Sequence, residues 1–134
     1  MIGRVNHIAI AVPDINKSRR TYKHNLGAQV SEVTEQLKHK VKVCFISLPN
    51  TKIELITPLG EDSPLINFLK KNPAGGIHHI CYEVENIIES RDKLIRLGTK
   101  IIGSGEPTVG AHGKLVLFLN PKDFSGTLIE LEEK

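Results

Sequence analysis

The chain has 134 residues, 40% of them hydrophobic and 25% charged, which predicts one soluble globular domain large enough to bury a core. The net charge of +3 suits an anionic small-molecule partner, whereas the 4% aromatic content argues against a nucleic-acid partner. No apolar run approaches the roughly 20 residues that a membrane span requires. Because the first strand begins within four residues of Met1, we expect a cytoplasmic protein, or a mitochondrial matrix protein if a presequence was removed before Met1.

The first part of the chain predicts the element order β-α-β-β-β. Asp14 is a favourable helix N-cap, and Gly27 is typical of the residue that ends a helix, so we expect a helix between them. Alternating or continuous apolar residues predict strands around this helix. The four strands expected in this module cover residues 5–12, 29–35, 41–48 and 51–56.

A link over residues 58–76 precedes a second set of elements in the same order. The link contains a short helix over 63–69, with Ser63 as its cap and Pro64 at its first position. In the second set, Asn86 caps a helix that ends at Gly98, and a Gly/Pro-rich loop covers 103–113. The four strands expected in this module cover residues 77–85, 99–102, 115–119 and 127–132.

The two sets read as an internal repeat. His7 and His79 open equivalent first strands at a lag of 72 residues, and Glu54 and Glu130 interrupt equivalent apolar fourth strands. A repeat of this kind predicts an α+β fold of two pseudo-symmetric βαβββ modules that complete one another. We expect one domain over 1–134, with module one at about 1–57 and module two at about 77–134.

The repeat would bring His7, His79, Glu54 and Glu130 toward one axis. Two imidazoles and two carboxylates suit a divalent ion such as Co²⁺, Mn²⁺, Zn²⁺, Ni²⁺ or Fe²⁺, and burying an unpaired carboxylate is costly. His78 pairs with Asn6 in the repeat, so we expect its side chain on the opposite face of the strand.

Two further features carry weaker signals. Cys44 and Cys81 lie in apolar runs without CxxC spacing and are expected to be buried thiols in a reducing compartment. The segment 110–114 has no phosphate-loop pattern and is expected to be a flexible loop that closes over a ligand.

Several stretches together resemble the methylmalonyl-CoA epimerases, a family within the vicinal-oxygen-chelate superfamily. They are the first strand Val-Asn-His-Ile-Ala-Ile, the strand Lys-Ile-Glu-Leu at 52–55, Gly-Gly-Ile-His-His-Ile at 75–80, Gly-Ala-His-Gly-Lys at 110–114 and Thr-Leu-Ile-Glu-Leu at 127–131. The resemblance covers essentially the whole chain. It implies a glyoxalase-like fold, a homodimer and an acyl-CoA substrate.

The resemblance also implies a site and a reaction. The metal, most often cobalt in this family, would be held by His7, His79 and Glu130 with Glu54 at the fourth position. The reaction would epimerise (2R)- and (2S)-methylmalonyl-CoA in propionyl-CoA metabolism, with Glu130 as a base at C2. Some relatives place a second catalytic glutamate on the third strand, but residues 40–45 contain no carboxylate. Glu54 or a water molecule would then serve, and the sequence leaves both open.

Two other functions stay open at this stage. One is a glyoxalase-I-like isomerase that acts on a glutathione hemithioacetal through the same kind of metal-stabilised enolate. The other is a non-catalytic binding protein of the same superfamily, against which the set His7, His79 and Glu130 argues. An iron-dependent extradiol dioxygenase fits less well, because Glu54 would crowd the position that oxygen needs.

Overall fold

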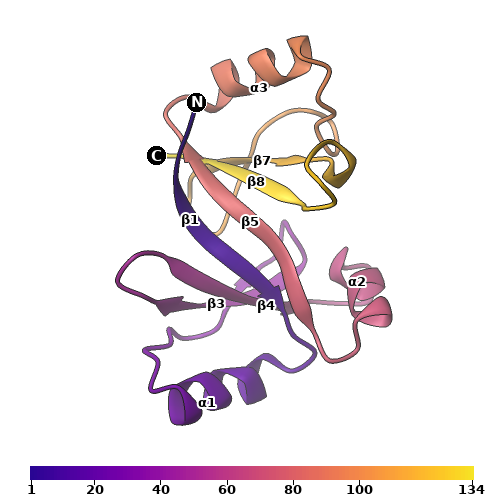
Figure 1. Cartoon of the computed structure of the whole chain (residues 1–134). Coiled ribbons are helices and arrows are strands. Elements are labelled where there is room, and N and C mark those ends of the chain that lie inside the picture. Colours follow the sequence, from indigo (N-terminus) through magenta and orange to yellow (C-terminus); the bar gives the residue numbers. More distant parts are fainter. The chain divides into compact units, whose positions relative to one another are not determined.

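The computed structural model describes residues 1–134 and confirms the repeated element order (Figure 1). The order β-α-β-β-β occurs twice, and a short helix joins the two sets. The first set consists of β1 (Ile2–Ala11), α1 (Ile15–Asn25), β2 (Thr34–Gln36), β3 (Val41–Ser47) and β4 (Lys52–Pro58). The helix α2 (Leu65–Lys71) follows, and the second set consists of β5 (Gly76–Val84), α3 (Ile87–Arg96), β6 (Thr108–Val109), β7 (Leu115–Leu119), the 3₁₀ turn η1 (Pro121–Asp123) and β8 (Ile129–Glu133).

The helix caps follow the sequence prediction with one shift. The Asp14 side chain accepts a hydrogen bond from the Lys17 amide, and the Asn86 side chain accepts from the Ile88 and Glu89 amides. Helix α2 begins at Leu65, one residue later than predicted, because Pro64 takes the N-cap position that the sequence assigned to Ser63.

Two predicted strands differ from the structure. Only Val30 of the stretch 29–33 makes a bridge, to Ile46, and regular pairing starts at β2. Of residues 99–102, Ile101 alone bridges, to Leu119. The strand that pairs with β7 on this side is instead β6, which lies inside the loop predicted over residues 103–113. Gly103 and Gly105 have positive φ values, 79° and 82°, that bend the chain before it can pair.

The chain forms two compact units whose bounds cut through β1 and β5. One unit contains residues 1–7 and 79–134, and the other contains residues 8–78. In the first unit the strand order is β1-β5-β8-β7-β6, and in the second it is β2-β3-β4-β1. None of the helices combines the length and the apolar character needed to cross a lipid bilayer.

In the unit of residues 1–7 and 79–134, the side chains of β8 point alternately to the two faces of the sheet. Ile129 and Leu131 join the core beneath α3, which also contains Ile87 and Leu94. Figure 1 shows α3 lying over β7 and β8 in this unit. Because successive strand residues point to opposite faces, Glu130 and Glu132 project from the face turned away from this core.

The unit of residues 8–78 packs α1 on its strands. Ile15 of α1 joins a buried cluster with Cys44, Ile46 and Leu55 from β3 and β4. Burial raises the pKa of the Cys44 thiol from 9.0 to about 11, against an opposing effect of Arg19. Cys44 is therefore a neutral buried thiol, as the sequence predicts.

Candidate metal and acid–base site

Three polar side chains meet in the unit of residues 1–7 and 79–134. The Nε2 atoms of His7 and His79 lie 3.1 Å and 2.9 Å from Glu130 Oε2, and 3.3 Å from each other. All three residues are buried, with exposed fractions of 1%, 4% and 6%. The structure thus brings together His7, His79 and Glu130, as the sequence predicts.

The strand register explains this convergence. β8 runs between β5 and β7, with Glu130 opposite Cys81 of β5 and Phe118 of β7. His79 precedes Cys81 by two residues, so both side chains lie on the same face of β5. The Phe118 ring packs edge-on against the His79 imidazole, with the ring centroids 5.5 Å apart, and so lies beside the cluster.

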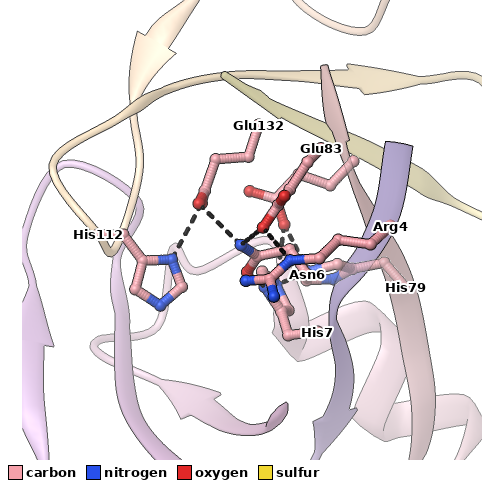
Figure 2. Close-up of polar contacts among 8 residues, drawn as sticks. Arg4, Asn6, His7, His79, Glu83, His112 and Glu132 are labelled. Atoms are coloured by element: carbon pink, nitrogen blue, oxygen red, sulfur yellow. Dashed lines mark hydrogen bonds and ion pairs between the residues drawn. The ribbon is translucent and has the colours of Figure 1, made fainter. Parts of the chain in front are cut away.

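The orientation of His7 is set by its neighbour Asn6 (Figure 2). Asn6 Nδ2 donates to Glu83 Oε1 at 3.0 Å and to Glu132 Oε1 at 3.2 Å. Since carboxylates accept only, these two bonds fix which end of the amide is nitrogen. Asn6 Oδ1 therefore faces His7 Nδ1 at 2.8 Å and accepts its proton, so the His7 ring in its neutral form has its lone pair on Nε2.

The two carboxylates that hold Asn6 have partners of their own. Arg4 Nε donates to Glu83 Oε1 at 2.9 Å. Burial disfavours the charge on Glu83, but the hydrogen bonds from Arg4 and Asn6 outweigh it and hold the pKa of this carboxyl below its usual range. Glu132 Oε2 lies 3.0 Å from His112 Nδ1. Figure 2 shows His112 approaching Glu132 from the side opposite Arg4.

The donor set fits a divalent cation. Burial alone would raise the pKa of Glu130, yet the hydrogen bonds and charges that His7 and His79 supply in their protonated forms lower it to about 2, so the carboxylate is ionised at neutral pH. Two imidazole nitrogens and a carboxylate oxygen within 3.3 Å of one another are the ligand types that Zn²⁺ and Co²⁺ take in proteins. Neutral imidazole lone pairs at such a distance repel unless a cation or proton lies between them.

The other predicted residues lie as follows. Glu54 is buried on β4 in the unit of residues 8–78, opposite Phe45 of β3. In the same unit, the His78 ring packs edge-on against Phe68 of α2 at 5.1 Å. Cys81 is fully buried, and its Sγ lies within 4.8 Å of the ligand atoms of His7 and Glu130, which makes it a possible further donor.

Four residues of the site were assigned no role from the sequence: Asn6, Glu83, Glu132 and His112. One signal was present, because Glu132 follows Glu130 at strand spacing and must share its face. The contact of His112 with Glu132 carries no such signal, since it depends on how the β6–β7 turn lies against β8.

Comparisons with known proteins agree with this geometry. Residues 6–118 match the family described as the glyoxalase/bleomycin resistance protein/dioxygenase superfamily. The chain is 61% identical over 133 residues to the ethylmalonyl-CoA/methylmalonyl-CoA epimerase of Cereibacter sphaeroides, with 99% of each chain covered. It is 53% identical over 132 residues to the mitochondrial methylmalonyl-CoA epimerase of Homo sapiens, with 98% of this chain and 74% of that protein covered. A Streptomyces coelicolor methylmalonyl-CoA epimerase variant solved in complex with 2-nitronate-propionyl-CoA has a TM-score of 0.92 at 26% identity, with 100% of this chain and 96% of that chain covered.

Proposed function

Because the chain belongs to the glyoxalase/bleomycin resistance protein/dioxygenase superfamily, we propose that it is an epimerase that interconverts (2R)- and (2S)-methylmalonyl-CoA. The observation that carries the proposal is the buried meeting of His7, His79 and Glu130 in a chain 61% identical to an epimerase of this substrate. The name of that relative also makes ethylmalonyl-CoA a second substrate to test.

The substrate chemistry explains why such a site is useful. The C2 proton lies between a thioester carbonyl and a carboxylate, so its removal produces an enolate whose negative charge spreads onto oxygen. Catalysis requires a base near C2 and a fixed positive charge near those oxygens. A buried site strengthens both effects, because it excludes water and lowers the local dielectric.

His7, His79 and Glu130 would hold a divalent cation, which we propose to be cobalt. When bound, the cation would supply the charge that stabilises enolate oxygens. The resemblance to the family adds Glu54 as a fourth ligand and homodimer as the assembly, and both remain predictions. Asn6 supports the ligand role of His7, because it keeps the proton on Nδ1 and the lone pair on Nε2.

Glu130 would be the base on one face of C2. Its low pKa keeps the carboxylate ionised at neutral pH, in the form that accepts a proton. Its position against two imidazoles limits its movement, so a proton taken from C2 is held close to the carbon that loses it.

The test is C2 proton exchange of methylmalonyl-CoA in deuterated water, followed by NMR. Metal-stripped protein, cobalt-loaded protein and the His79→Ala variant are compared, with His78→Ala as the matched control one residue away. We expect exchange from the cobalt-loaded protein and from His78→Ala, and none from the other two. Turnover of methylglyoxal with glutathione, and no exchange by any form, would replace this proposal with a glyoxalase-like isomerase.

A further inference from the structure

The Asn6 amide lies between two buried carboxylates and the candidate ligand His7 (Figure 2). Its Nδ2 donates to Glu83 at 3.0 Å and to Glu132 at 3.2 Å, and its Oδ1 faces His7 Nδ1 at 2.8 Å. Glu83, Glu132 and His7 are all buried, with exposed fractions of 7%, 4% and 1%. One amide therefore links two acidic side chains without a predicted role to a residue that has one.

Stability alone does not explain the placement of Glu83 and Glu132. They are direct partners on the neighbouring strands β5 and β8, where ionised carboxylates repel each other. Apolar side chains of similar volume are often neutral or stabilising at buried charged positions. Arg4 donates to Glu83, but its side chain is 73% exposed, and exposed ion pairs contribute little stability. The pair therefore points to a role in the site.

The two carboxylates allow the Asn6 amide only one orientation. Each of them can accept a hydrogen bond but cannot donate one, so the amide end between them must be Nδ2. The other end, Oδ1, then accepts from His7 Nδ1. Either carboxylate is sufficient to set this orientation, because a single acceptor already excludes the amide oxygen from its side.

A reversed amide would oppose metal binding by His7. The amide NH₂ would then face His7 Nδ1, and a neutral ring would carry its lone pair on Nδ1 and its proton on Nε2. Nε2 is the atom that lies 3.1 Å from Glu130 and 3.3 Å from His79 Nε2. A proton on Nε2 would occupy the side of the ring that faces the other two candidate ligands.

We propose that Glu83 and Glu132 are positioning residues of the metal site, which act through Asn6 to keep the His7 lone pair on Nε2 for a divalent cation. This inference rests on the proposed function, because it concerns a ligand of that site. Groups that orient a metal-binding imidazole typically change metal affinity by about 10- to 100-fold when they are removed.

The redundancy of the two carboxylates gives the proposal its test. Glu83→Met removes one acceptor, and Glu132→Gln replaces the other by a side chain that can also donate. We expect each single variant to weaken cobalt binding by less than about fivefold, because the remaining carboxylate still orients the amide. The double variant should weaken it by about 10- to 100-fold, which is more than the product of the two single effects.

Two measurements separate this role from a structural one. Cobalt affinity is measured by competition with a chelator, and NMR of zinc-loaded protein with isotope-labelled histidine reports whether His7 carries its proton on Nδ1. Wild type should show that proton, and the double variant should lose it. The control is the double variant Glu85→Met with Glu106→Gln, which removes two exposed glutamates of surface ion pairs in the same unit and should leave both readouts unchanged.

A second pair of variants tests the same link at Asn6 and does not change the carboxylates. Asn6→Asp and Asn6→Leu both remove the two donors, but only aspartate keeps an oxygen acceptor for His7 Nδ1. Asn6→Leu should therefore bind cobalt about 10- to 100-fold more weakly than Asn6→Asp. This comparison keeps the proposal testable if the double glutamate variant does not fold.

Two results would overturn the inference. One is equal cobalt affinity of Asn6→Leu and Asn6→Asp. The other is a double glutamate variant that keeps the His7 Nδ1 proton and whose loss of affinity equals the product of the single effects, since simple removal of charge would produce it. If wild type binds no divalent cation, the proposed metal site fails and this inference with it, a result distinct from the other two, in which wild type binds cobalt.

Discussion

Asn6→Asp is the substitution that tests the buried network most directly, because it changes charge and hydrogen bonding but not shape. Asn6 donates to Glu83 at 3.0 Å and to Glu132 at 3.2 Å. Aspartate would lose both donors, and hydrogen bonds to charged groups contribute about 1.5–3 kcal/mol each. It would also bring a third carboxylate against two buried ones, with a repulsion of about 5 kcal/mol per pair at 3 Å and an effective dielectric constant of 20.

These terms predict a large loss of stability that protonation partly relieves. The loss of two donors alone corresponds to about 3–6 kcal/mol, a large part of the stability of a typical small domain. Repulsion would raise the folded-state pKa of a carboxyl in this group, so the deficit should be smallest near pH 4–5 and grow as the pH rises toward 7. Aspartate can still accept from His7 Nδ1, so the metal site keeps that contact.

Urea unfolding at pH 5 and pH 7 measures this effect. The control is Asn67→Asp on the exposed surface of α2, where we expect a change within about 0.5 kcal/mol at both pH values. Equal stability of Asn6→Asp and wild type at pH 7 would refute the reasoning, because it would mean that the amide nitrogen does not hold the two carboxylates.

Three further predictions follow from single sites. The raised pKa of Cys44 contributes up to about 3 kcal/mol of stability, which is fully present below pH 9 and should be lost as the pH rises through about 11. In urea unfolding, Cys44→Val should therefore lose less stability than wild type when the pH is raised over this range. Gly110→Ala should reduce the stability by about 1–3 kcal/mol, because the added Cβ clashes with Val116. Val116→Ala should reduce the stability less in that variant than in wild type, and thermal unfolding of wild type, the two single variants and the double variant measures the difference. Glu130→Gln should lose both cobalt affinity, measured by calorimetry, and C2 exchange, and normal cobalt binding would contradict its ligand role.

The sequence predicted most of what depends on local pattern and on the repeat. The β-α-β-β-β order follows from apolar alternation and from caps such as Asp14 and Asn86, each of which makes the bond expected of it. The meeting of His7, His79 and Glu130 follows from placing equivalent strands of a repeat about one axis. Neither step required knowledge of distant contacts.

The sequence did not predict features that depend on register between distant strands. Parallel pairing of β5 with β8 sets Glu83 opposite Glu132, and no local pattern reports that register. Strand β6 lies in a stretch rich in Gly and Pro, and it forms because β7 offers an edge rather than because Thr108 and Val109 prefer it. The role of Asn6 depends on its contacts with Glu83 and Glu132, so it could not be predicted from the sequence either.

The charge balance of the network gives a physical reason for a cation at this place. Three buried carboxylates, Glu83, Glu130 and Glu132, lie in one unit, and the permanently charged side chain of Arg4 contacts Glu83 (Figure 2). Arg4 neutralises Glu83, and Glu132 is held by neutral or titratable donors. Glu130 is left facing two imidazoles, which are not permanently charged groups. A divalent cation on these three ligands would supply a permanent compensating charge, and it would leave positive charge over for a dianionic enolate.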